Sequence, residues 1–332
     1  MDRLKQLHHF LKQCGLEQAS LSWLPTDASF RHYARLNDTK RSYILMDAPA
    51  PEIPEQFALI DKLLLKNGLS APLIYQQDFK NGFLLLEDFG NDTYTRLLAQ
   101  GENEESLYKL ALDSLFEIQK IKDFDGVPHY DEKWLKYGLS AFLDWFIPMA
   151  LPEPLPIKAT QDFYQMWIEL YKEAMKSPQG LILIDYHIDN MIRLPGRPGC
   201  KACGLLDFQD AKIGPFAYDL VSLLEDARRN VPSSIRQKMR TYYLQKGVVG
   251  DKDIFEKAYH ILAAKRHTRV IGVFTRLKAR DHKNQYLCHI PRVWKLLESH
   301  LNEPYLKSLK DWLDIYIPSE YRKVPSCLQT ST

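Results

Sequence analysis

Residues 181–224, LILIDYHIDNMIRLPGRPGCKACGLLDFQDAKIGPFAYDLVSLL, decide the fold of this chain. Three short apolar runs, at 181–184, 191–192 and 204–206, predict buried strands. The Pro/Gly cluster at 195–199 marks a turn between the second and third runs. An apolar-periodic run that begins at Asp219 predicts a helix. The stretch therefore predicts a strand, a hairpin and a helix in succession.

Three oxygen-bearing side chains stand where these strands end: Asp185, Asn190 and Asp207. Carboxylate and amide oxygens suit Mg²⁺ beside substrate phosphates. Phosphoryl transfer to a hydroxyl also needs an acidic group that orients and deprotonates the acceptor. Asp and Asn are common turn residues, so a structural role is the alternative for each one alone. The ordered set predicts a phosphotransfer site in which Asp185 is the base and Asn190 and Asp207 bind Mg²⁺.

Composition and charge indicate an ordinary globular protein. Hydrophobic residues make up 45% of the 332 and charged residues 26%, which is typical of soluble domains. A net charge of +2 gives no reason to expect nucleic acid or an anionic membrane as the partner. Residues 1–16 are amphipathic rather than continuously apolar, so they do not resemble a signal peptide. We expect a cytoplasmic protein.

The five cysteines do not predict a disulfide framework, because their number is odd and their spacing irregular. Cys200 and Cys203 form a lone C-x-x-C pair, and a zinc site would need a second pair. We expect two thiols on a hairpin.

Taken together, the motifs resemble those of the aminoglycoside phosphotransferase-like (APH/choline kinase) family, small-molecule relatives of the protein kinases. Within it, they are most similar to the anomeric N-acetylmuramate/N-acetylglucosamine kinases of cell-wall recycling. The likeness runs from about residue 20 to about residue 300. The segments that carry it are DFQDA at 207–211, YDLVSLL at 218–224, DASFRHY at 27–33, YILMDAP at 43–49 and GFLLLEDFG at 82–90.

The resemblance implies an α+β, bilobal, protein-kinase-like fold. The N-terminal nucleotide-binding lobe would span residues 1–88 and the helical C-terminal lobe residues 89–332, with ATP and Mg²⁺ between them. It also implies transfer of the γ-phosphate to a sugar hydroxyl, most simply the anomeric hydroxyl of N-acetylmuramate or N-acetylglucosamine. An aminoglycoside, choline or an amino acid is the alternative acceptor. The sequence leaves the oligomeric state open.

Residues 29–36 and 41–46 predict a β-hairpin. By resemblance, the turn before it covers the phosphates, which makes Ser29, Phe30 and Arg31 nucleotide-binding residues; a plain hairpin with a solvent-facing Arg31 is the alternative. By the same resemblance, residues 87–89 are the hinge whose backbone binds adenine, which adds the residues Glu87, Asp88 and Phe89.

Helical periodicity covers most of the chain after residue 90, with one further helix at residues 54–68. Residues 265–283, most of which belong to a predicted helix at 253–279, are strongly basic, and they either bind an anionic group of the substrate or form a solvated helix face. In the fold that the chain resembles, Asp219 ties down the catalytic loop and does no chemistry. The candidate substrate-binding residues are His187, Gln209, Asp210, Arg269 and Arg276.

Two positions depart from the wider kinase pattern. Leu183 and Ile184 precede Asp185 where kinases have a His that steadies the loop, and Met46 stands near the usual phosphate-pairing Lys. These departures motivate a second hypothesis from another class, a nucleotide-binding pseudokinase with a regulatory role.

Overall fold

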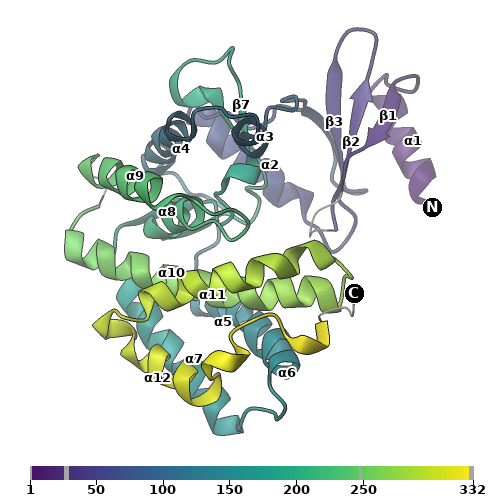
Figure 1. Cartoon of the computed structure of the whole chain (residues 1–332). Helices are drawn as coiled ribbons and strands as arrows, with labels where there is room; N and C mark the ends of the chain where they lie inside the picture. Colours follow the sequence, from purple (N-terminus) through teal and green to yellow (C-terminus); the bar gives the residue numbers. More distant parts are fainter. Residues whose placement is uncertain (1, 26–29, 247–248, 329–332) are drawn as a thin grey trace. The chain divides into compact units, whose positions relative to one another are not determined.

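The computed structural model describes residues 2–25, 30–246 and 249–328 (Figure 1). Contacts divide the chain into two compact units. The predicted lobe boundary after residue 88 stays a prediction, because compact units defined by contacts need not coincide with functional lobes. Unit 1 comprises Met1–Ile121, Asp125–Val127 and Ile188–Ala211. Unit 2 comprises Lys122–Phe124, Pro128–His187 and Lys212–Thr332.

Unit 1 contains an antiparallel five-stranded sheet of order β1-β2-β3-β5-β4. β2 and β3 pair from His32 opposite Asp47 to Asn37 opposite Ser42, which confirms the predicted hairpin over its described part. The five strands are β1 (Ser20–Trp23), β2 (His32–Asn37), β3 (Ser42–Asp47), β4 (Ile74–Asp78) and β5 (Phe83–Glu87).

Helix α1 (Arg3–Gln13) packs against this sheet, beside which it lies in Figure 1. Its apolar face is fully buried at Phe10, whose ring stacks on Phe83 of β5 with 5.5 Å between centroids. The leucines Leu7 and Leu11 lie on the same face at helical spacing and are also buried. The amphipathic pattern of the first residues therefore serves the core of unit 1.

The predicted helix at 54–68 is confirmed as α2 (Pro54–Lys66), which begins with a proline and is followed by Gly68 at φ 78°. The hairpin in residues 190–206 is confirmed too, because β7 and β8 pair antiparallel with Met191 opposite Leu205. The other elements of unit 1 are α3 (Tyr94–Ala99), α4 (Glu104–Gln119), η2 (Ile188–Asn190), β7 (Met191–Arg193), η3 (Gly199–Ala202) and β8 (Cys203–Leu205). Cys200 and Cys203 are free thiols, as expected.

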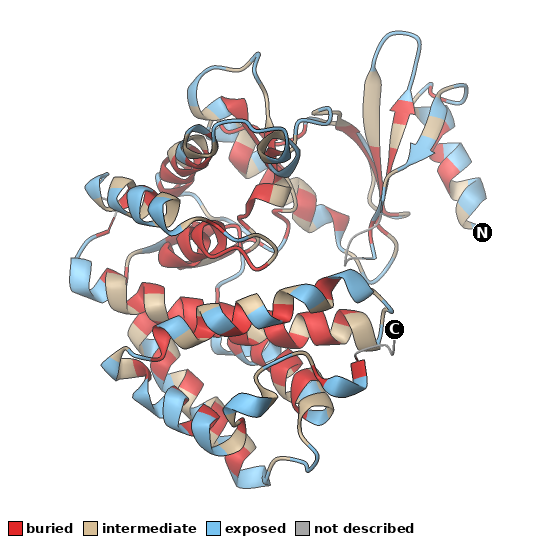
Figure 2. Ribbon diagram, viewed as in Figure 1, coloured by how far each residue is buried: buried red, intermediate tan, exposed pale blue. Residues whose placement is uncertain are grey.

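In unit 2, strand β6 (Gln179–Ile182) leads into the segment that carries Asp185. It pairs antiparallel with β9 (Lys212–Pro215), a strand that the sequence did not predict. Helix α8 (Ala217–Leu224) follows at once, and all eight of its residues are buried, which Figure 2 shows as a wholly red helix. The predicted helix that begins near Asp219 is thereby confirmed.

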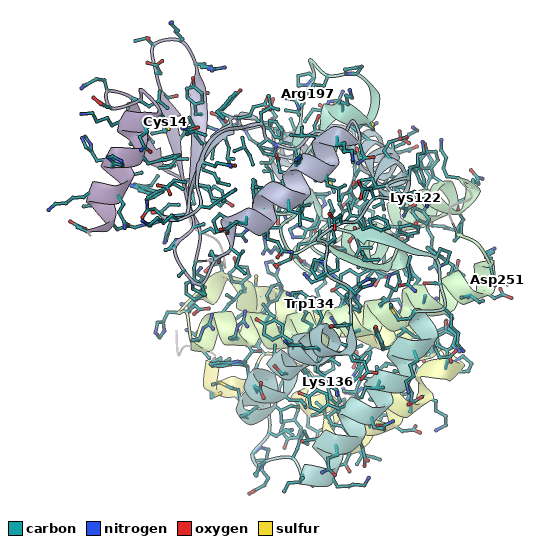
Figure 3. The ribbon with its side chains drawn as sticks, turned by 180° about the vertical axis from the view of Figure 1, so that it is seen from behind. Cys14, Lys122, Trp134, Lys136, Arg197 and Asp251 are labelled. Atoms are coloured by element: carbon teal, nitrogen blue, oxygen red, sulfur yellow. The ribbon has the colours of Figure 1, made fainter. Side chains whose placement is uncertain are left out.

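The long helix α10 (Lys252–Ala279) organises the rest of unit 2. Asp251, labelled in Figure 3, caps its start by accepting a hydrogen bond from the Ile254 N–H at 3.0 Å. The helix contacts α8, α11 (Ile290–His300), α5 (Glu132–Ala141) and α7 (Ile157–Ala174). At Gly272 a Cβ would lie 2.2 Å from the carbonyl carbon of Ala141, so only glycine permits this approach.

The other elements of unit 2 complete a mainly helical body. They are η1 (Phe142–Phe146), α6 (Ile147–Ala150), α9 (Ser233–Gln245), η4 (Asn284–His289), η5 (Pro304–Leu306), α12 (Lys307–Tyr316), η6 (Ser319–Tyr321) and η7 (Ser326–Leu328). Within the described ranges, no helix is long and apolar enough to cross a bilayer.

One interpretation of the basic segment is wrong for its first residues. Lys265, Arg266 and His267 are 1%, 4% and 0% exposed, so they do not form a solvated helix face. The reason is the position of α10, which is surrounded by other helices along most of its length, so that positive charges at these positions face protein rather than water.

Candidate active site

The segment Leu183–His187 of unit 2 is a strained loop directly after β6. Ile184 has φ 70°, a left-handed conformation that a β-branched residue adopts only when its surroundings force it. The force comes from Asp219 on α8, whose two carboxylate oxygens accept the N–H groups of Leu183 at 2.6 Å and Ile184 at 3.0 Å. The tie expected of Asp219 is therefore present in the structure.

The Ile184 carbonyl is held from the other side. It accepts hydrogen bonds from the Arg266 guanidinium at 3.1 Å and the Ser222 hydroxyl at 3.2 Å. Arg266 is also 3.5 Å from a carboxylate oxygen of Asp185. One buried arginine of α10 thus fixes both the strained residue and the acidic side chain that follows it.

These surroundings fix the position of the Asp185 side chain and keep it ionised. Its side chain is 27% exposed, whereas that of Arg266 is 5% exposed. Burial alone would raise the pKa of Asp185, but the positive charges of Arg269 and Arg266 outweigh it and lower the pKa below its usual value. Asp185 is therefore an ionised carboxylate near neutral pH, ready to accept a hydrogen bond from a hydroxyl.

Asn190 and Asp207 lie together in unit 1. The β7–β8 hairpin closes on them, because the Leu206 N–H donates to the Asn190 carbonyl at 2.9 Å. The Asn190 amide is 3.5 Å from the Asp207 Oδ2. Asp207 itself has φ 55°, which is a left-handed backbone conformation. The predicted pair of metal ligands is thus brought side by side.

The other oxygen of Asp207 faces two side chains of unit 1. Oδ1 accepts hydrogen bonds from Arg31 at 3.1 Å and Gln209 at 3.0 Å. Arg31 is 8% exposed and also lies 3.4 Å from Glu52, so the alternative of a solvent-facing Arg31 is wrong. Arg31 can be buried because the carboxylates of Asp207 and Glu52 compensate its charge.

These residues fit a magnesium ion by the chemistry of their donors. The hard oxygens that Mg²⁺ prefers are supplied by the Asp207 carboxylate and the Asn190 amide. The Asn190 amide contacts Oδ2 of Asp207, whereas Arg31 and Gln209 contact Oδ1. The two oxygens of the Asp207 carboxylate therefore have different partners. Asp185 belongs to unit 2, and its convergence with this pair stays a prediction.

A family model described as "Phosphotransferase enzyme family" (APH) matches residues 21–253 of the chain. The chain belongs to the phosphotransferase enzyme family. The predicted family and enzyme class, a phosphotransferase, are thereby confirmed.

Relatives within the family match over nearly the whole chain. The N-acetylmuramate/N-acetylglucosamine kinase of Caulobacter vibrioides is 33% identical, and the match covers 95% of this chain and 96% of that protein. The protein of the same name from Pseudomonas aeruginosa is 33% identical over 94% of this chain and 96% of its own length.

Solved structures of phosphotransferases show the fold. A choline/ethanolamine kinase family protein from Mesorhizobium loti superposes with a TM-score of 0.61 and 11% identity, over 95% of this chain and all of that chain. An ADP-bound aminoglycoside phosphotransferase has a TM-score of 0.59 and 16% identity, over 89% of this chain and 97% of that chain. The predicted kinase-like fold is confirmed.

The hinge residues of this phosphotransferase are more constrained than predicted. The Glu87 N–H already donates to the Leu73 carbonyl at 2.8 Å, so the prediction that backbone N–H groups of this segment bind adenine narrows to Asp88 and Phe89. The Asp88 side chain accepts from Arg35 at 3.0 Å and from the Gly90 N–H at 2.9 Å, which fixes the hinge conformation.

The remaining predicted site residues are distributed as follows. His187 is buried and its N–H donates to the Asp185 carbonyl at 3.1 Å, while Asp210 is exposed. Arg269 contributes to the field at Asp185, and Arg276, two turns later on α10, is half-buried.

Phe30 is exposed, and its N–H donates to Glu52 at 3.3 Å. Ser29 lies outside the described residues.

Sequence reasoning missed Arg266 and Ser222 as residues that hold the catalytic loop. It also missed Glu52, which is paired with Arg31. A signal for Arg266 was present, since the cationic pair Lys265-Arg266 follows directly on the apolar run ILAA at residues 261–264. A charge in such a place needs a buried partner.

Proposed function

We propose that the protein transfers the γ-phosphoryl group of ATP to the anomeric hydroxyl of N-acetylmuramate or N-acetylglucosamine, in the recycling of cell-wall sugars. The observation that carries this proposal is the match, over 94–95% of the chain, to two phosphotransferases named for these two acceptors. The held, ionised carboxylate of Asp185 supports the chemistry.

In this reaction Asp185 orients the acceptor hydroxyl and takes its proton as the bond to phosphorus forms, a contribution of about 10²- to 10⁴-fold in rate. Its low pKa suits a late proton transfer, because the loose transition state needs the hydroxyl positioned more than deprotonated. Asn190 and Asp207 hold Mg²⁺, which neutralises charge on the phosphates when it is bound. Arg31 adds a fixed positive charge beside Asp207.

For the acceptor, we assign Arg269 and Arg276 to the lactyl carboxylate that distinguishes N-acetylmuramate from N-acetylglucosamine. A guanidinium matches a carboxylate with two parallel hydrogen bonds. Gln209, Asp210 and His187 remain candidates for the sugar hydroxyls. Replacing either arginine by Gln is expected to raise KM for N-acetylmuramate while KM for N-acetylglucosamine changes little.

The experiment is a transfer assay with ATP, Mg²⁺ and each sugar, followed by ³¹P NMR of the product. The expected product is an acid-labile sugar 1-phosphate. The matched control acceptor is the methyl glycoside of N-acetylglucosamine, which has no free anomeric hydroxyl and should receive no phosphate. Transfer to the glycoside would refute the anomeric assignment, and transfer to choline, an amino acid or an aminoglycoside alone would refute the amino-sugar acceptor.

The second candidate is a nucleotide-binding pseudokinase. It is favoured by Leu183 and Ile184 before Asp185, and by the fully buried Met46 at the place of a phosphate-pairing Lys. Against it stands the network of Asp219, Ser222 and Arg266, which holds the loop without the usual His. ATP binding without transfer to any acceptor in the panel would favour the pseudokinase.

A further inference from the structure

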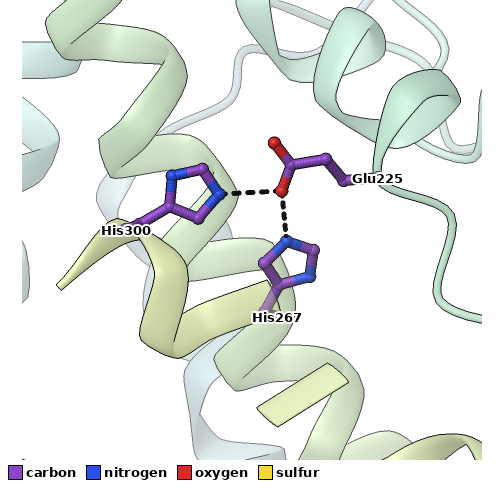
Figure 4. Close-up of side chains that lie close together, drawn as sticks. All are labelled: Glu225, His267 and His300. Atoms are coloured by element: carbon purple, nitrogen blue, oxygen red, sulfur yellow. Dashed lines mark hydrogen bonds and ion pairs between the residues drawn. The ribbon is translucent and has the colours of Figure 1, made fainter. Parts of the chain in front are cut away.

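A buried cluster of metal-ligating side chains lies in unit 2, apart from the residues assigned to the reaction. It consists of Glu225 at the end of α8, His267 in the middle of α10 and His300 at the end of α11 (Figure 4). The Nε2 atoms of both histidines lie 2.8 Å from the same oxygen, Oε2 of Glu225. The three residues are 6%, 0% and 5% exposed.

Glu225 is partnered by two histidines and a tyrosine. In the part of the chain that the structure describes, Glu225 forms no ion pair with an Arg or Lys, and its other oxygen accepts from the Tyr259 hydroxyl at 2.7 Å. An imidazole binds a metal ion through a nitrogen that carries no proton, and both Nε2 atoms already face the carboxylate. A carboxylate in the interior is costly to bury unless a positive charge joins it.

One histidine of the cluster has an outer partner of the kind that metal-binding histidines use. The Nδ1 of His300 lies 2.8 Å from the Nδ1 of His260, whose side chain is 18% exposed and 3.9 Å from Glu303. Such a hydrogen bond fixes the tautomer and ring orientation of a ligand. Glu303 and His260 also form a polar route from the surface to His300.

We propose that Glu225, His267 and His300 bind one Zn²⁺ ion at a site separate from the one that binds magnesium and nucleotide. Two imidazole nitrogens and one carboxylate oxygen are a ligand set that zinc takes, with a fourth position for water. The neutral nitrogens disfavour Mg²⁺, which prefers oxygen. The ion supplies the positive charge that the buried carboxylate lacks.

The geometry needs a small adjustment to admit the ion. Zinc lies about 2.0 to 2.2 Å from such ligands, so tetrahedral binding widens each N–O separation from 2.8 Å to roughly 3.3 Å. The proton on Nε2 of each histidine then moves to Nδ1, where that of His300 is donated to His260. His267 Nδ1 has no hydrogen-bond partner in the described part of the chain, so His300 is the better oriented of the two ligands.

Zinc at this site joins three helices. One of them, α8, carries Asp219, and another, α10, carries Arg266, the two residues that hold the Leu183–Ile184 backbone. A ligand that binds only the folded chain stabilises it by mass action. The ion therefore acts as a structural clamp behind the catalytic loop and takes no part in phosphoryl transfer.

The test is calorimetric titration of the EDTA-treated, dialysed full-length protein with ZnCl₂ in excess Mg²⁺, which occupies oxygen-only sites. We expect one zinc per chain and a rise in the thermal midpoint. His300→Gln and His267→Gln should each weaken binding at least 100-fold. His260→Ala should weaken it by about 10- to 100-fold, the usual effect of removing an outer partner.

The matched control is the double variant C288S/H289Q, because Cys288 and His289 form an exposed thiol–imidazole pair at 3.7 Å that zinc also favours. It should bind zinc as tightly as the wild type. Loss of binding in this control, or undiminished binding in the two histidine variants, would overturn the proposal, as would the absence of stoichiometric binding to the wild type.

If a histidine variant does not fold, Co²⁺ loading of the wild type decides: four-coordinate absorption without a thiolate band supports the site, and a thiolate band overturns it.

Discussion

Asp185 and Asp219 are two carboxylates of the same unit, and their surroundings give them opposite properties. Asp219 is fully buried, and burial raises its pKa to about 7 despite the hydrogen bonds from Leu183 and Ile184. Asp185 keeps partial access to solvent beside the guanidinium groups of Arg266 and Arg269, which lower its pKa.

The difference shows which groups can replace the hydration that a carboxylate loses when it is buried. Full positive charges favour the ionised form, which a phosphotransferase needs at the acceptor hydroxyl, whereas two backbone N–H groups do not fully replace hydration. One residue is therefore suited to reaction and the other to holding the loop, although both are aspartates close to the same backbone segment. Arg266 takes part in both surroundings, through Ile184 and through Asp185.

The largest expected effect is that of Asp185→Asn on turnover. The amide cannot accept the proton of the acceptor, so kcat with N-acetylmuramate should fall about 10²- to 10⁴-fold, while the thermal midpoint and ATP affinity stay near those of the wild type. Steady-state kinetics and a thermal melt measure this. A variant that retains more than a tenth of wild-type kcat would remove Asp185 from the reaction.

Asp219→Asn should act on stability. An Asn side chain has one acceptor oxygen, so one of the two backbone N–H groups loses its partner, at a cost of about 1–3 kcal/mol. Urea unfolding at several pH values gives the free energy difference between wild type and variant.

The pH dependence of that difference sharpens the comparison. A carboxyl whose folded pKa is raised to about 7, above its ordinary value of 3.8, contributes stability below pH 3.8 that is lost as the pH rises through 7. The advantage of the wild type over Asp219→Asn should therefore shrink from pH 5 to pH 8. An advantage that grows over this range would mean that Asp219 is ionised in the folded protein, like Asp185.

Arg266→Gln should have a smaller effect that depends on pH. Removal of the guanidinium raises the pKa of Asp185 and moves the acidic limb of kcat/KM to higher pH, so the loss of activity is greater at pH 5.5 than at pH 8. Arg266→Lys is the matched control, since it keeps the charge and loses the planar fork. Equal acidic limbs in the Gln variant and the wild type would show that Arg266 does not set the charge of Asp185.

Asp162→Asn should change least. Asp162 lies on α7, its side chain is 45% exposed, and it pairs with Lys158 at 2.5 Å; such surface pairs contribute about 0.5 kcal/mol or less. Urea unfolding should give a free energy within that range, and kinetics should match the wild type. A larger loss in the free energy of unfolding would show that burial does not explain the difference between Asp185 and Asp219.

Much of the site followed from local pattern. The alternation of apolar runs with the Pro/Gly turn predicted the β7–β8 hairpin, and a hairpin brings its two ends together, which placed Asn190 beside Asp207. Helical spacing predicted α2 and the helices of unit 2. Strand β9 was missed because its four residues include Gly214 and Pro215, which have low strand propensity.

The chain by itself determined the family and most of the order of strands and helices, and it supplied the candidates for the reactive residues, because these depend on neighbours a few positions away. Only the tertiary structure decided the left-handed backbone at Ile184, the burial of Arg266 and the cluster of Glu225 with two histidines. Those features arise from contacts between residues 35 to 82 positions apart. The physical reason is that burial and compensation of charge are properties of packed helices, and no local pattern of residues specifies which partner a buried charge will meet.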